Sequence, residues 1–461
     1  MQVDPFTIQV EESVLEDLKL RLQRTRLSNN AEFTSALDYG QDFQFQQSLL
    51  EHWLTKYDWR AYERELNRFS HFKAQVTPKL RLHFIHERSR VPGAVPLLML
   101  HGWPGSVWEF HECIRPLVAP EPGRALRLKQ AFHVVAPSLP GFGWSQASEV
   151  QGMGAAEVAR VMHRLMTGLG YSKYAVQGGD WGALVAKQIA LQFPHHCLAV
   201  HLTMPLVAPP PLSTKSMTAR KAALLATMAV HASPLGKFVL SQQDQQRLLQ
   251  TKHYLAKGNA YFNLQTSKPH TPGFALADSP SGLLAWISEK LQLWTDGKGN
   301  VLNALSKDEI ITNVMIYWVT NTIASSMRLY KEISLDGPEV FSDYCHVPTG
   351  WASFPKEIVS FPKSWVEKTH NLVHHTEFAD GGHFPAWEQP TMFVQDLRQF
   401  FHRAMPLDTA LTLAAQREQQ ALIPQTLPTK RDLATNLLVF APVLPVPAVA
   451  ALASYLLLSK L

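Results

Sequence analysis

The chain has 461 residues, of which 46% are hydrophobic and 18% charged, so it can bury a large core and is neither disordered nor fibrous. Its formal net charge is +5, from 43 basic and 38 acidic residues that are spread along the sequence without a basic run. Binding to nucleic acid is therefore not expected.

The cysteines and the first residues of the chain bear on three classes of protein, which are disulfide-rich, zinc-binding and secreted proteins. Cys113, Cys197 and Cys345 are far apart and odd in number, and none of them belongs to a C-x-x-C pair. This pattern indicates neither a disulfide framework nor a zinc site, and it fits a reducing compartment. Residues 1–5 lack a basic region followed by an apolar block, which argues against a cleaved secretory signal.

Residues 1–90 form a leading segment that we interpret as an N-terminal helical meander. Residues 10–22 place apolar side chains at helical spacing, with Ser13 as the expected N-cap and Glu16 completing a capping box. A second helix is expected from about Phe43 to Trp53. The aromatic residues of this segment indicate a layer that packs on another domain.

Residues 91–204 have the pattern expected for the first part of an α/β core. Val95 to Leu100 is a continuous apolar run, as in a buried strand. Further strands are expected at 80–86, 132–137, 174–176 and 198–202. A helix is expected at 155–169. Strands that alternate with helices of this length predict a parallel sheet with helices on both faces.

The most informative stretch lies between the strand at 174–176 and a helix-like segment at 183–193. Its spacing, Gly178-x-Asp180-x-Gly182, is that of the nucleophile elbow of α/β hydrolases, with aspartate in the position of the usual serine. The two glycines permit a turn that is tight enough to expose the side chain between them. We therefore expect a carboxylate oxygen of Asp180 to act as the nucleophile.

A second turn is expected to supply one half of an oxyanion hole. The strand at 95–100 ends in His101-Gly102-Trp103-Pro104-Gly105-Ser106. In α/β hydrolases, one oxyanion-hole amide comes from such a loop and the other from the residue after the nucleophile. This assigns the backbone N–H groups of Trp103 and Trp181.

From residue 205 to 344 the pattern is mostly helical with proline-rich joints, and we interpret it as a helical lid inserted into the sheet domain. Residues 345–405 then restore the core pattern, with strands at 345–351 and 371–378 and a final helix from about Thr391 to His402. His383 lies in the loop after the last strand, where the order nucleophile, acid, histidine places the base. A neutral imidazole there can take a proton from water.

The chain resembles the microsomal-type epoxide hydrolases, including the juvenile hormone epoxide hydrolases, over roughly residues 5–405. The matching pieces are His101-Gly102-Trp103-Pro104-Gly105-Ser106, Gly178-Gly179-Asp180-Trp181-Gly182, Asn313-Val314-Met315-Ile316-Tyr317-Trp318, Pro348-Thr349-Gly350 and Gly381-Gly382-His383-Phe384. The resemblance implies an α/β-hydrolase fold with an N-terminal meander and an inserted helical lid. It also implies conversion of epoxides to vicinal diols without a metal or organic cofactor.

The expected reaction needs an acid on the lid. A carboxylate that attacks an epoxide carbon in line drives the leaving oxygen toward the lid, and a phenol with a pKa of about 10 is a suitable proton donor. The candidates are Tyr254, Tyr261, Tyr317, Tyr330 and Tyr344, and their spacing alone does not choose among them. The resemblance implies that Tyr261 and Tyr330 polarise the oxygen, and we expect the other three to pack in the core.

The acid that orients His383 has several candidates. Glu357 follows the strand at 345–351, and the resemblance matches it to the family's acid by its position relative to Pro348-Thr349-Gly350. The alternatives are Asp380, Asp343 and Glu339.

Two other functions remain open from the sequence. Haloalkane dehalogenases also carry an aspartate followed by a tryptophan at the elbow, and the ring N–H groups of Trp103 and Trp181 would then bind halide. A non-catalytic lipid-binding relative would keep the pocket without turnover. We favour the epoxide hydrolase because of the lid tyrosine pair and the N-terminal meander. Its expected partners are water and a lipophilic epoxide, because the lid is aromatic and apolar.

Residues 406–461 are expected to form a polar linker and an apolar tail. Residues 436–458 are almost wholly apolar and long enough to span a bilayer, but Pro442, Pro445 and Pro447 would break a single helix. Membrane contact through this tail is one expectation, and packing on the protein or in a homodimer is the alternative. We expect the protein in the cytoplasm or on the cytosolic face of the endoplasmic reticulum.

Overall fold

The computed structural model describes residues 1–27, 37–120, 130–207, 240–337 and 339–405. The linker and apolar tail predicted for 406–461, with the membrane contact at 436–458, lie outside the described residues. Within the described ranges, no helix combines the length and the apolar character that a bilayer crossing requires.

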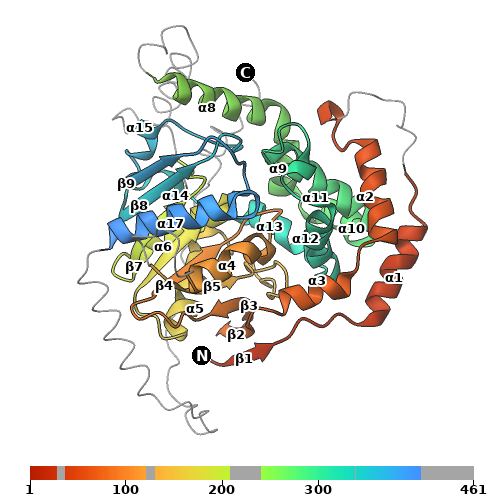
Figure 1. Cartoon of the computed structure of the whole chain (residues 1–461), viewed down its shortest axis with the longest axis horizontal. Helices are drawn as coiled ribbons and strands as arrows, with labels where there is room; N and C mark the ends of the chain where they lie inside the picture. The colour runs from red at the N-terminus through yellow and green to blue at the C-terminus, as the bar shows by residue number, and fades with distance from the viewer. Residues whose placement is uncertain (28–36, 121–129, 208–239, 338, 406–461) are drawn as a thin grey trace.

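A nine-stranded sheet forms the centre of the molecule (Figure 1), in the order β1-β2-β3-β5-β4-β6-β7-β8-β9. The strands are β1 (Val3–Phe6), β2 (His71–Thr77), β3 (Leu80–Glu87), β4 (Val95–Leu100), β5 (Phe132–Pro137), β6 (Tyr174–Gly178), β7 (Cys197–Leu202), β8 (Cys345–Ser353) and β9 (His370–Glu377). The seven expected strands are therefore confirmed, apart from their exact ends. The prediction of a parallel sheet is only partly right, because β1, β2 and β3 pair antiparallel at one side of the parallel strands.

The two faces of the sheet are covered by different helices. Alternate residues of β4 point to opposite faces, and Leu97 and Met99 belong to a different apolar cluster from Leu98 and Leu100. The first cluster includes residues of α4 (His111–Val118) and α17 (Pro390–Ala404), and the second includes α5 (Ala155–Gly168) and α6 (Asp180–Gln192). Helices on both faces are thus confirmed.

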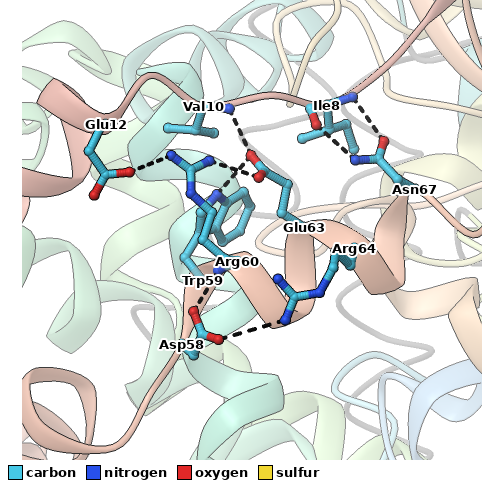
Figure 2. A network of polar contacts seen from close by, with 9 residues as sticks. All are labelled: Ile8, Val10, Glu12, Asp58, Trp59, Arg60, Glu63, Arg64 and Asn67. Atoms are coloured by element: carbon cyan, nitrogen blue, oxygen red, sulfur yellow. Dashed lines mark hydrogen bonds and ion pairs between the residues drawn. The ribbon is translucent and has the colours of Figure 1, made fainter.

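The N-terminal segment contains α1 (Glu12–Gln23), α2 (Phe43–Thr55) and α3 (Trp59–Leu66), and Figure 2 shows how α3 holds the extended chain before α1. Buried Glu63 accepts hydrogen bonds from the backbone N–H of Val10 (2.7 Å) and from the indole of Trp59 (3.2 Å). Asn67 exchanges two hydrogen bonds with the backbone of Ile8, at 2.9 and 2.8 Å. These side chains replace the backbone partners that an extended segment would otherwise lack.

The predicted capping box at Ser13 is wrong. Helix α1 begins at Glu12, and its N-cap, Glu11, makes no side-chain capping bond. The fixed backbone of Val10 and the ion pair between Glu12 and Arg60 (2.8 Å) set the start of the helix earlier than Ser13. Tertiary contacts here override the local capping signal.

The described part of the lid is helical, as expected. It contains α8 (Gln242–His253), α9 (Ala260–Ser267), α10 (His270–Asp278), α11 (Pro280–Trp294), α12 (Lys307–Thr320), α13 (Ile323–Ile333) and α14 (Glu339–Ser342). The lid also contains the short helices η4 (Tyr254–Gly258) and η5 (Val301–Asn303). Four further short helices lie outside the lid, and they are η1 (Leu37–Tyr39), η2 (Val107–Phe110), α15 (Lys363–Val366) and α16 (Pro385–Glu388). The N-terminal segment packs beside the lid (Figure 1), where Asp308 of α12 contacts His52 (2.6 Å) and Tyr62 (3.0 Å).

A buried polar cluster ties α17 to two strands of the sheet. Asp396, which is 2% exposed, accepts hydrogen bonds from His201 of β7 (2.9 Å), His374 of β9 (2.8 Å) and Thr376 (2.5 Å). Burial alone would raise the pKa of Asp396, but the hydrogen bonds from the two histidines more than offset this and lower it. The cluster fixes β9, which leads into the loop that carries His383.

We predict that Asp396→Asn lowers the free energy of unfolding by about 3 kcal/mol near neutral pH, because it removes a buried charged acceptor from several hydrogen bonds. Since the pKa of Asp396 is lowered in the folded state, this contribution is present above the unfolded pKa of about 3.9 and is lost as the pH falls through the folded value. Urea unfolding at a series of pH values measures the difference. The exposed Asp38→Asn is the control, and a difference that stays constant well below pH 4 would contradict the prediction.

Candidate active site

Asp180 lies in a backbone turn that only glycine neighbours allow. It is the first residue of α6, three residues earlier than the expected helix start, and its φ is +48°. A Cβ on Gly178 would overlap the carbonyl of Gly182, and a Cβ on Gly182 would overlap that of Leu100. The left-handed conformation of a non-glycine residue is strained, and the packed strand and helix on either side hold it in place.

The loop after β4 presents a backbone amide to this carboxylate. The N–H of Trp103 donates to Oδ1 of Asp180 at 2.8 Å, and Gly102 comes so close that a Cβ there would overlap the same oxygen. Lid helix α12 fixes this loop, since Asn313 Nδ2 donates to the carbonyl of Pro104 at 2.8 Å. The second predicted amide donor, Trp181, follows Asp180 directly in α6.

His383 and Glu357 complete a row of buried groups beside Asp180. His383 Nε2 lies 3.5 Å from Asp180 Oδ2, and its Nδ1 lies 2.5 Å from Glu357 Oε1. Burial lowers the pKa of His383, but the carboxylates of Glu357 and Asp180 outweigh this and raise it well above its ordinary value. Burial also raises the pKa of Glu357, against the opposing charge of His383.

The alternative acids lie elsewhere. Asp380 forms an ion pair with Lys298 at 2.9 Å and is largely exposed. Glu339 and Asp343 lie in and just after α14, and neither contacts His383. Among the candidates, only Glu357 is placed beside the imidazole.

The loop that carries His383 is anchored to the end of lid helix α11. The N–H of His383 donates to the carbonyl of Trp294 at 2.9 Å, and the N–H of Gly381 donates to Asp296 at 3.0 Å. Gly381 has a φ of +112°, and a Cβ on Gly382 would overlap the Trp294 carbonyl. The paired glycines therefore serve both an unusual backbone angle and a close approach.

The two lid tyrosines face the tryptophans of the elbow and of the loop after β4. The ring of Tyr261 stacks on Trp103 at 5.3 Å, and Tyr330 makes edge contacts with Trp103 (5.7 Å) and Trp181 (4.9 Å). Burial, with the charge of Asp180, raises the pKa of both phenols well above 10. Both are therefore protonated at neutral pH and can donate hydrogen bonds.

The remaining lid tyrosines differ from one another. Tyr317 is buried and donates to the carbonyl of Gly105 at 2.6 Å, so it packs and also supports the loop after β4. Tyr344 is 41% exposed rather than part of the core, because it lies just before β8 at the surface. The hydroxyl of Tyr254 lies 2.7 Å from that of Tyr261, which the packing prediction did not anticipate.

No group of three metal-binding side chains occurs in the part of the chain that the structure describes. The indole Nε1 atoms of Trp103 and Trp181 are buried without a hydrogen-bond partner among these residues, as a halide site would require. The choice between epoxide and haloalkane thus needs evidence beyond the geometry.

Comparison with known proteins supplies that evidence. The family model described as "Epoxide hydrolase N terminus" matches residues 3–110, and that described as "alpha/beta hydrolase fold" matches residues 95–347. Epoxide hydrolase 1 of Sus scrofa is 34% identical to this chain, over 86% of this chain and 88% of its own. The chain belongs to the epoxide hydrolase family. The crystal structure of juvenile hormone epoxide hydrolase from the silkworm Bombyx mori is similar with a TM-score of 0.79 at 34% identity, covering 87% of this chain and 95% of that one.

Family membership selects among the functions that the sequence left open. The protein is an epoxide hydrolase with the α/β-hydrolase fold, and its substrates are an epoxide and water, which it converts to a diol. The haloalkane dehalogenase and the non-catalytic lipid-binding relative are therefore set aside. The resemblance stated from the motifs is confirmed.

Sequence reasoning missed two contributors to the site of this hydrolase. Tyr254 begins η4 and Tyr261 lies in the next helix, α9, so the contact between their hydroxyls depends on the bend between the two helices and no helical spacing indicated it. Asn313 belongs to a piece that matched the family, but nothing local indicated that its amide reaches the carbonyl of Pro104, which is 209 residues away in the sequence.

Proposed function

We propose that this hydrolase opens lipophilic epoxides in two covalent steps, with Asp180 as the nucleophile. The observation that carries the proposal is the environment of the Asp180 carboxylate. Its Oδ1 is held by the Trp103 amide at 2.8 Å, and its Oδ2 lies 3.5 Å from His383 Nε2. One oxygen is thus bound as an oxyanion would be, and the other is free to attack.

In the first step, Oδ2 of Asp180 forms a bond to one ring carbon while the bond from that carbon to the epoxide oxygen breaks. The developing alkoxide takes a proton from Tyr261 or Tyr330. Their high pKa values favour this role, because neither phenol loses its proton to solvent before the substrate arrives. The product is a hydroxyalkyl ester of Asp180, and a phenolate remains.

In the second step, His383 takes a proton from water, and the resulting hydroxide attacks the ester carbon. The Trp103 and Trp181 amides hold the oxyanion, and His383 returns its proton to the departing diol oxygen. Esterification removes the negative charge of Asp180, which is one of the charges that raise the pKa of His383. The imidazole is therefore more readily neutral at the step that needs a base. The freed carboxyl loses its proton, and the phenolate regains one.

The surroundings of the tyrosines support a lipophilic substrate. The rings of Trp103, Trp181 and Phe262 lie within 4.9–6.1 Å of Tyr330 or of one another. Apolar walls with a few convergent polar groups suit an apolar ligand that carries one oxygen. A panel of terpenoid, fatty-acid and aryl epoxides would show which of these the site prefers.

We predict that the first turnover in heavy-oxygen water releases diol with both oxygens unlabelled, one from the epoxide and one from Asp180. The isotope should appear in the peptide that contains Asp180, as measured by mass spectrometry. His383→Ala is the companion variant, and it should accumulate the ester because its hydrolysis lacks a base. A first diol that already carries the isotope would show direct attack by water and overturn the covalent scheme.

The lid tyrosines are expected to act in the first step only. Tyr261→Phe combined with Tyr330→Phe should slow ester formation by about 10²–10⁴-fold, since general acid assistance is lost. Rapid-quench kinetics with enzyme in excess measures this rate. Tyr344→Phe, at an exposed ring, is the control. Ester formation at the normal rate in the double variant would remove both tyrosines from the role.

We also propose that the apolar tail at 436–458 contacts a membrane, which would place the protein on the cytosolic face of the endoplasmic reticulum. The apolar composition of the tail supports this, and a homodimer contact is the alternative. In fractionated cells, the full chain should sediment with membranes and a chain without residues 431–461 should not. Equal distribution of the two would refute membrane contact through the tail.

A further inference from the structure

A small pocket lies against Asp180 and His383, apart from the lid tyrosines. Its volume is about 20 Å³, which is room for one water molecule and too little for an organic group. It is lined by ends of the core strands, by the loops that follow them and by residues of η2, α16 and α17, and neither Tyr261 nor Tyr330 is among its lining residues. Its polar lining comes from Glu109, Gln177, Thr203 and the two residues of the site.

Two polar atoms of this lining are buried without a hydrogen-bond partner among the described residues. They are Oε1 of Gln177 and Oγ1 of Thr203, and each of these residues is 2% exposed. A third lining atom, Nε2 of His383, lies 3.5 Å from Asp180 Oδ2. A buried polar atom without a partner is costly, and such atoms that converge on one small pocket are the usual mark of a bound water. Gln177 is the second-last residue of β6, one residue before Gly178, and Thr203 follows β7 directly.

Glu109 adds a donor to the same pocket. It is 8% exposed, and it lies against the loop after β4, where a Cβ on Gly105 would overlap its carboxyl. Burial raises the pKa of Glu109 to about 8, against the opposing charge of His383. At neutral pH this side chain is therefore mostly a carboxylic acid, which can donate a hydrogen bond.

We propose that this pocket holds the water that hydrolyses the Asp180 ester, and that Glu109, Gln177 and Thr203 position it. The proposal rests on the covalent mechanism above. Water can donate to Gln177 Oε1 and to His383 Nε2, while it accepts from the hydroxyls of Thr203 and Glu109. Before the attack, its two lone pairs and two protons match two donors and two acceptors. One of the two hydrogen bonds that the water accepts breaks as that lone pair turns to the ester carbon, while the other still holds the water.

The chemical step is balanced within this arrangement. The water oxygen bonds to the ester carbon of Asp180 as one proton passes to His383. The bond between that carbon and the diol oxygen then breaks, and the diol oxygen takes the proton from His383. Glu109, Gln177 and Thr203 exchange no proton with the substrate and act as positioning residues.

The test separates ester formation from ester hydrolysis. With enzyme in excess over an aryl epoxide, rapid quench and intact-mass measurement give the two rates independently. Glu109→Leu and Thr203→Val should slow hydrolysis at least about tenfold, because each removes a hydrogen bond to the attacking water, and should leave ester formation within about twofold. Glu109→Gln should recover most of the loss, because its amide still donates.

The control for the threonine is Thr312→Val. This residue of α12 is also fully buried, and its hydroxyl bonds to Tyr57 at 3.0 Å, away from the pocket. It should hydrolyse the ester at the normal rate. Normal hydrolysis in folded Thr203→Val, with no accumulation of ester, would overturn the proposal whether or not Glu109→Leu folds. Normal hydrolysis in folded Glu109→Leu would remove Glu109 from the positioning role. If the unchanged enzyme forms no ester, the covalent mechanism itself fails, which is a distinct outcome.

Discussion

The close approach of three backbone segments beneath Asp180 is the constraint on which the site depends. The loop after β4, the end of β6 and the start of α6 meet at Gly102, Gly178 and Gly182, where any larger side chain would overlap a carbonyl or the carboxylate itself. The nucleophile is therefore positioned by the fold and not by flexible side-chain contacts. A group fixed in this way needs little reorganisation when charge moves during the reaction.

The N-terminal segment and the lid together support the loop after β4, which carries the Trp103 amide. The segment holds α12 through the contacts of His52 and Tyr62 with Asp308. Helix α12 in turn holds the loop after β4 through Asn313 and Tyr317. His52 and Tyr62 thus help to hold the Trp103 amide at hydrogen-bonding distance from Asp180, although neither of them touches the carboxylate.

Features that depend on local spacing could be predicted from the sequence. The apolar runs gave the core strands, and the glycines around Asp180 and His383 marked their turns. Strands β1 and β2 were missed because their pairing joins distant, partly exposed segments, and the start of α1 was misjudged because Glu63 and Arg60 determine it from outside the helix. Glu109, Gln177 and Thr203 follow three different strands or lie near their ends, so their convergence appears only in the folded chain.

The hydrogen bond from the His383 N–H to the carbonyl of Trp294 means that the lid helices differ in how well they tolerate substitutions. Apart from Tyr261 and Tyr330, side chains on α9 and α13 that face the substrate can be exchanged without moving the base. The end of α11 cannot, because Trp294 and Asp296 carry the loop of His383. Substitutions that broaden the choice of epoxide should therefore occur mainly on α9 and α13, while the sequence at the end of α11 should change little.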